Sequence, residues 1–177
     1  MPSPVFVITG AMAAGKSTVA MALAKRLTRS AYVEGDVFLR MMINGKAHMG
    51  PELNADAQAQ LHLRQQLSTD AVRRFADFGF SVIYEDILIG SDLVSACERL
   101  ADLSPRVIVL TPSIASLEKR DRERNKTGYS EEFAPDILAC ALMNETPRIG
   151  TWIDTTDMSI NDVVDRILDA YPVNAPV

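Results

Sequence analysis

The chain has 177 residues, of which 47% are hydrophobic and 23% charged, so we expect one globular domain over residues 1–177 with a substantial apolar core. The formal charge of -5 excludes a broad basic surface for nucleic acid or an anionic membrane, and the absence of a basic N-terminal segment or a long apolar run favours a cytoplasmic protein. Cys97 and Cys140 stand among apolar neighbours without metal-ligand spacing, which predicts two buried thiols instead of a disulfide or a metal site.

The first half of the chain alternates between strand and helix patterns. Residues 5–8 form an apolar, β-branched run that is typical of a strand buried on both faces. Apolar residues at helical spacing predict a helix over residues 16–28, and residues 31–33 predict a short second strand. A helical region follows over residues 53–78, and Gly79 is expected to end it.

The second half continues this alternation. Residues 81–84 predict a third strand, residues 91–103 a helix, and residues 106–110 a fourth strand. Ser113 is a candidate N-cap for the next helix, residues 150–154 predict a fifth strand, and Ser159 precedes a final amphipathic helix. Such alternation is typical of a parallel α/β sheet flanked by helices, whose ligands lie beyond the carboxyl ends of the strands.

A glycine-rich loop separates the first strand from the first helix. Residues 10–17 match the pattern GxxxxGKS, in which backbone N–H groups wrap the phosphates of a nucleotide. Lys16 is expected to reach the β- and γ-phosphates, and the Ser17 hydroxyl to bind Mg²⁺. The loop predicts nucleotide binding, a property that hydrolases, switches and kinases share.

Asp36 follows the second strand, so its carboxylate is expected at the same edge of the sheet as the phosphate loop. There it could orient or deprotonate a substrate hydroxyl. An alternative is that Asp36 caps a helix that runs through Phe38 to Met42.

Glu85 and Asp86 end the third strand, where a phosphate-loop protein holds Mg²⁺ or the waters of the metal. Because side chains alternate in direction along a strand, only one of the two is expected to face the metal. The other could cap a turn or approach the acceptor, and the sequence leaves this choice open.

Basic residues concentrate between residues 119 and 126. Arg120 and Arg124 share one helix face and could close over the triphosphate as a lid, predicted over about residues 113–130. The alternative is a solvated helix face with ion pairs among Glu118, Asp121, Arg122 and Arg124.

Together, the phosphate loop, the Gly35-Asp36 step, the segment 82–90 and the RxxxR pattern resemble the small P-loop kinases typified by chloramphenicol 3-O-phosphotransferase, with gluconate and shikimate kinases as relatives. The resemblance implies a three-layer P-loop NTPase fold with a five-stranded parallel sheet of order 2-3-1-4-5 and a small lid. It also implies a carboxylate base at Asp36 and lid arginines at Arg120 and Arg124. The nucleotide-binding residues expected on this basis are Gly10, Ala13, Ala14, Gly15, Lys16, Ser17, Thr18, Arg120 and Thr155.

The sequence departs from this family at two places. Glu85-Asp86 replaces the Asp-Asp pair of the antibiotic kinase, and residues 41–49, in the acceptor region expected over about residues 37–78, match none of these families.

Three functions are consistent with these features. The first is an ATP- and Mg²⁺-dependent phosphotransferase that acts on a hydroxyl of an antibiotic, sugar or sugar acid. The second is a nucleoside or nucleotide monophosphate kinase, which needs arginines for the acceptor phosphate; the acceptor half offers Arg40, Arg64, Arg73 and Arg74. The third is a non-enzymatic nucleotide-binding regulatory protein, which requires neither Asp36 nor the lid arginines.

Overall fold

The computed structural model describes residues 3–50, 52–123 and 134–173. A five-stranded parallel sheet of order β2-β3-β1-β4-β5 forms its centre, which confirms the predicted fold class and strand order. The strands are β1 (Val5–Gly10), β2 (Ser30–Glu34), β3 (Ser81–Glu85), β4 (Arg106–Leu110) and β5 (Thr151–Ile153).

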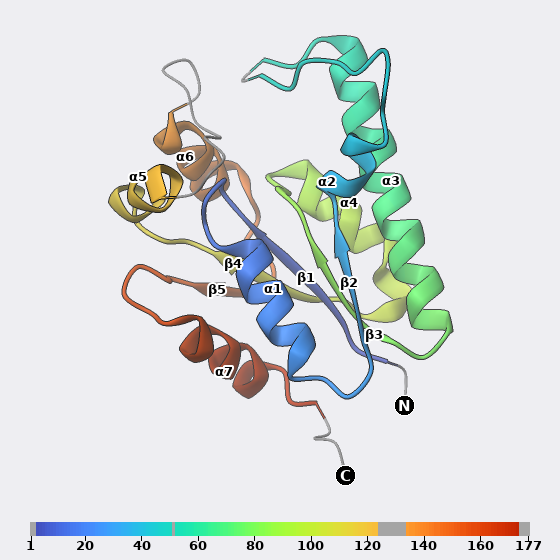
Figure 1. Cartoon of the computed structure of the whole chain (residues 1–177), viewed down its shortest axis with the longest axis vertical. Coiled ribbons are helices and arrows are strands. Elements are labelled where there is room, and N and C mark those ends of the chain that lie inside the picture. The colour runs from blue at the N-terminus through green and yellow to red at the C-terminus, as the bar shows by residue number, and fades with distance from the viewer. Residues whose placement is uncertain (1–2, 51, 124–133, 174–177) are drawn as a thin grey trace.

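Helices cover both faces of the sheet, giving three layers (Figure 1). One face packs against α1 (Lys16–Lys25) and α7 (Ile160–Ala170), and the other packs against α3 (Ala55–Asp77) and α4 (Ser91–Arg99). The remaining helices are α2 (Asp36–Arg40), α5 (Ile114–Glu123) and α6 (Pro135–Glu145). Among the described residues, no helix is both long and apolar enough to cross a membrane.

The two hydrophobic cores follow from the alternation of side chains along the strands. In β1, Phe6 and Ile8 belong to the core beneath α1 and α7, whereas Val5 and Val7 belong to the core beneath α3 and α4. All four side chains are fully buried. A central strand that packs on both faces therefore reads as a continuous apolar run, as the sequence predicted.

Two predicted helices differ from the structure in length, and one helix was not predicted. The first ends at Lys25 instead of Thr28, and the helix expected over 91–103 stops at Arg99 before a 3-10 turn, Ala101–Leu103. Helix α6 was not predicted, because its apolar residues 137–143 form an unbroken run without helical spacing. Both cysteine predictions were wrong in detail: Cys140, on α6, is exposed, and Cys97 is only half-buried.

The two N-caps expected from the sequence, Ser113 and Ser159, begin helices α5 and α7 in the structure. Ser113 Oγ accepts a hydrogen bond from Ser116 N at 3.3 Å before α5, and Ser159 forms a capping box with Asp162 before α7. Because all five strands run in parallel, the phosphate loop, Asp36, Asp86 and the turn after Ile153 lie at one edge of the sheet.

Candidate active site

The phosphate loop joins β1 to α1, as predicted. Gly15 has φ +96°, which favours glycine, and it is the N-cap of α1 without any side-chain cap. Helix α1 therefore presents its first-turn N–H groups to a ligand, an arrangement suited to phosphate. The Lys16 side chain is largely buried, and its Nζ donates a hydrogen bond to Ala11 O at 3.1 Å.

A cavity of about 370 Å³ opens beside this loop. The predicted nucleotide-binding residues that line it are Ala13, Ala14, Gly15, Lys16, Ser17, Thr18, Arg120 and Thr155. Its wall also includes Met158, Ile160 and Val163, which supply apolar surface suited to a nucleotide base. Gly10, the remaining predicted residue, ends β1 at the start of the loop.

Arg120, on α5, lines this cavity. Its guanidinium donates to Ala14 O at 3.1 Å and to Thr155 O at 2.7 Å. The residue thus bridges the phosphate loop and the turn after β5. Its predicted partner Arg124 lies outside the described residues, as does part of the predicted lid, while α5 occupies residues 114–123.

Glu85 is the carboxylate that faces the phosphate loop. Its Oε1 accepts hydrogen bonds from Ser17 Oγ at 2.8 Å and from Tyr32 Oη at 2.9 Å, and the residue is buried. Burial and the charge of Glu85 raise the pKa of Tyr32 well above its usual value, so Tyr32 stays protonated and keeps donating. The sequence analysis missed Tyr32, because no motif in strand β2 indicates that this tyrosine donates a hydrogen bond to Glu85.

The Ser17 hydroxyl and the Glu85 carboxylate form a donor set that fits Mg²⁺. Both are oxygen ligands, and Mg²⁺ bound with a nucleotide usually takes one or two protein oxygens and completes its shell with phosphates and water. Among the described residues, no cluster of three or more His, Cys, Asp or Glu side chains could hold a metal ion.

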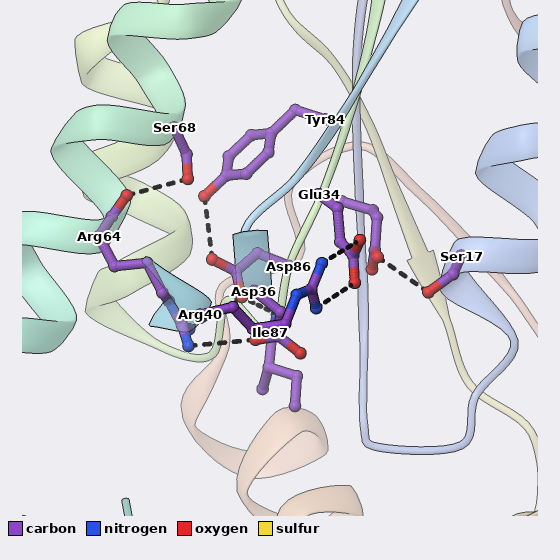
Figure 2. Close-up of polar contacts among 10 residues, drawn as sticks. Ser17, Glu34, Asp36, Arg40, Arg64, Ser68, Tyr84, Asp86 and Ile87 are labelled. Atoms are coloured by element: carbon purple, nitrogen blue, oxygen red, sulfur yellow. Dashed lines mark hydrogen bonds and ion pairs between the residues drawn. The ribbon is translucent and has the colours of Figure 1, made fainter. Parts of the chain in front are cut away.

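Asp86 points away from the loop, into a buried polar network (Figure 2). Its Oδ1 accepts from Arg64 Nη2 at 2.9 Å and from Ile87 N at 2.8 Å, and its Oδ2 accepts from Tyr84 Oη at 3.2 Å. Burial raises the pKa of Asp86 to about 6, although the charge of Arg64 opposes this shift. The structure therefore separates the two acidic residues: Glu85 faces the phosphate loop, and Asp86 faces Arg64 of α3.

Asp36 is the exposed end of the same network. Arg64 Nη1 lies 3.3 Å from its Oδ1, and the Asp36 side chain is 60% exposed. Asp36 is the first residue of α2, whose N-cap is Gly35, so the alternative reading of Asp36 as the cap is wrong. Gly35 is required for another reason: a Cβ at this position would lie 2.2 Å from Asp86 Oδ2.

A smaller cavity, of about 100 Å³, brings these groups together. Lys16 and Ser17 line it from the phosphate loop, and Asp36, Glu85 and Asp86 line it from the ends of β2 and β3. A phosphate held by the loop would thus face the Asp36 carboxylate across one small space.

Arg64 is the site residue whose role the sequence did not reveal. It was considered only as a cation for an acceptor phosphate, yet it is 7% exposed and joins Asp36 to Asp86. The available signal was its place on α3, where it shares the buried face with Ala57, Gln65, Ser68, Thr69 and Val72. A charged residue on such a face requires a buried partner.

Comparisons with known proteins agree with this fold. A family model described as an AAA domain matches residues 5–143, whereas a search of curated protein sequences finds no match. Similar solved structures include the tunicamycin resistance protein of Deinococcus radiodurans, with a TM-score of 0.72, 20% identity and 99% of each chain covered. The APS kinase of Mycobacterium tuberculosis, in complex with AMPPNP and APS, has a TM-score of 0.70 and 20% identity over 98% of this chain and 100% of that one.

A gluconokinase from Sinorhizobium meliloti 1021 is also similar, with a TM-score of 0.62 and 17% identity over 94% of this chain and 90% of that one. At such identities, the likeness shows a shared fold. The family model covers more than half of the sequence, so the chain belongs to the AAA domain family, and its fold is that of the small P-loop kinases.

Proposed function

We propose that the chain is an ATP-dependent phosphotransferase that moves the γ-phosphoryl group to a hydroxyl of a small molecule. The observation that carries this proposal is the cavity shared by Lys16 and Ser17 of the phosphate loop and by Asp36. A carboxylate that faces the terminal phosphate serves an acceptor hydroxyl. A regulatory protein that only binds nucleotide does not need one.

The nucleotide side of the site is assigned to the larger cavity. Backbone N–H groups of the loop and the start of α1 would hold the phosphates, and Lys16 would exchange its bond to Ala11 O for the β- and γ-phosphates. The base would rest on the wall that contains Met158, Ile160 and Val163, close to Thr155.

On the acceptor side, Asp36 would orient the hydroxyl and take its proton late in the transfer. Arg64 engages Asp36 through Oδ1 and is itself held by Asp86, so the carboxylate is anchored while most of its surface stays open. In a loose transition state, positioning of this kind provides most of what the protein contributes on the acceptor side.

Ser17 and Glu85 would hold Mg²⁺, which, when bound, neutralises charge on the phosphates. Tyr32 keeps the Glu85 carboxylate turned toward Ser17 through its hydrogen bond. Arg120, already at the loop, and Arg124, assigned from sequence alone, would stabilise the charge of the transferred group.

The test is ATP consumption against a panel of hydroxylated compounds, with ³¹P NMR of the products to detect a phosphate ester. We expect ester formation that requires Mg²⁺ and is lost in Lys16→Ala. A matched control is Lys25→Ala, which removes a lysine from the other end of α1. Binding of ATP without ester formation on any compound would contradict the proposal and favour a regulatory protein.

A further inference from the structure

The charges around the proposed acceptor site are predominantly negative. The charged side chains that line the small cavity are the carboxylates of Asp36, Glu85 and Asp86 and the ammonium of Lys16. Lys16 belongs to the phosphate loop and is reserved for the nucleotide in the proposed function. An acceptor that enters from the side of Asp36 therefore meets carboxylates first.

Arg64 offsets one of these negative charges but is not open to a ligand. Its two terminal nitrogens already contact Asp36 and Asp86, and it is only 7% exposed. Its Nε is buried and, among the described residues, has no hydrogen-bond partner. A planar guanidinium recognises an anion through two parallel N–H groups, and here such a pair of groups is not open to solvent.

The other arginines of the acceptor half are paired with carboxylates or lie far along α3. Arg40 is half-exposed and lies four residues after Asp36 on α2, but it already pairs with Glu34. Arg40 makes two bonds to Glu34, at 3.1 and 2.9 Å, and Arg73 makes two bonds to Asp102, at 2.8 and 2.7 Å. Arg73 also follows Arg64 by nine residues along α3, a separation of roughly 13 Å at the rise of an α-helix. Arg74 is one residue further, in the last turn of α3.

We propose, on the basis of the proposed phosphotransferase function, that the acceptor is an uncharged or cationic hydroxyl compound, such as a polyol, a glycoside or an amino sugar. Sugar acids and nucleoside monophosphates are excluded because their anionic groups would face carboxylates and, among the described residues, would find no guanidinium at this cavity that is free of a carboxylate partner. A hydroxyl donor or an ammonium group, in contrast, finds acceptor oxygens at this surface.

Asp86 is the residue that sets this selectivity. It is buried and supplies one of the two carboxylates on Arg64. Asp86→Asn therefore leaves Arg64 with Asp36 alone and removes one negative charge from the network. The substitution keeps the shape, and the amide oxygen can still accept from Ile87 N. The matched control is Asp102→Asn, which removes the carboxylate that pairs with Arg73. Arg73 lies on α3, as Arg64 does, but outside the cavity.

The experiment measures equilibrium binding by calorimetry on protein saturated with Mg²⁺ and a non-hydrolysable ATP analogue, which fills the phosphate loop. Two pairs of probes differ chiefly in charge: sorbitol with gluconate, and a nucleoside with its monophosphate. In the wild type, we expect each anionic member to bind at least tenfold more weakly than its uncharged partner or not at all. Asp86→Asn should strengthen binding of the anionic members at least tenfold, and Asp102→Asn should leave it unchanged.

Two results overturn the inference: an anionic member that binds the wild type as tightly as its uncharged partner, or an Asp86→Asn variant that gains no affinity for anions. If the wild type binds neither member of a pair, the Asp86→Asn variant decides alone: a gain of affinity for the anionic member supports the inference, and no gain overturns it. Phosphoryl transfer to the same probes separates this inference from the proposed function. Wild-type transfer to an anionic member overturns the inference and leaves the phosphotransferase standing, whereas analogue binding without transfer to any hydroxyl compound contradicts the function.

Discussion

Replacement of Arg64 by Met tests whether the buried network holds its charge as the structure indicates. The substitution removes the guanidinium of a side chain that is 8% exposed and leaves the Asp86 side chain, which is 3% exposed, without its cation. Loss of one partner of a buried ion pair usually costs about 3–5 kcal/mol. Because Tyr84 and Ile87 still donate to Asp86, we expect the low end, a loss of about 3 kcal/mol in the free energy of unfolding at pH 7.

The loss should shrink as the pH falls. The pKa of Asp86 is about 6 in the folded protein and 3.8 in the reference state, so the folded chain takes up a proton as the pH drops through 6. Below that pH, Asp86 is neutral and no longer requires Arg64. We therefore expect Arg64→Met to cost clearly less at pH 5 than at pH 7.

Urea unfolding at both pH values measures this effect, with Arg73→Met as the matched control on the same helix. Arg73 pairs with an exposed carboxylate, so its replacement should cost only a small fraction of the Arg64 loss. Adding Asp86→Asn to Arg64→Met should restore most of the lost stability, because the stranded charge is then removed. A loss that is equal at both pH values, or larger at pH 5, would refute the assignment of Asp86 as the buried charge.

Four further changes test other parts of the account. Lys16→Ala should weaken ATP binding by about 1.5–3 kcal/mol in calorimetry, the usual contribution of a charge-assisted hydrogen bond, with an unchanged circular dichroism spectrum; unfolding instead would contradict a binding role. Tyr32→Phe should raise the Mg²⁺ concentration needed for half-maximal nucleotide binding several-fold, because Glu85 loses a hydrogen-bond donor, and an unchanged requirement would remove Tyr32 from the site. Arg120→Ala should lower kcat more than it weakens ATP binding, which a purely structural contact would not do. Asn54→Ala should lower the free energy of unfolding by about 1 kcal/mol in urea, since Asn54 caps α3 through Ala57 N, and no loss would show that this cap is dispensable.

The fold was predictable because its signals are local. The apolar run of residues 5–8 and the helical spacing after Ser159 each identify an element from its own residues, and the phosphate loop fixes the order of one strand and one helix. Helix α6 was not predicted because every residue from 137 to 143 is apolar. Without alternating polar positions, the hydrophobic pattern has no period that distinguishes a helix from a strand.

The candidate site was predictable only where the backbone alone places a residue. The end of a parallel strand puts Asp36, Glu85 and Asp86 at one edge, and side-chain alternation requires the last two to diverge. Which of them faces the loop depends on Ser17 and Tyr32 on one side and on Arg64 on the other. Those contacts join residues that lie 22 to 68 positions apart in the chain, so they follow from tertiary packing and not from local sequence.

The central claim is that Asp36 serves the acceptor hydroxyl, and Asp36→Asn tests it directly. The amide keeps the size of the carboxylate and can accept a hydrogen bond, but it cannot take the proton. Nucleotide affinity and the rate of phosphoryl transfer are measured side by side on the acceptor that the panel identifies. The control is Asp165→Asn, which removes the carboxylate of the exposed pair with Arg26. We expect Asp36→Asn to bind ATP·Mg²⁺ nearly as well as the wild type and to lose roughly 10²–10⁴-fold in transfer, the usual contribution of a general base, whereas transfer at the wild-type rate would contradict the account.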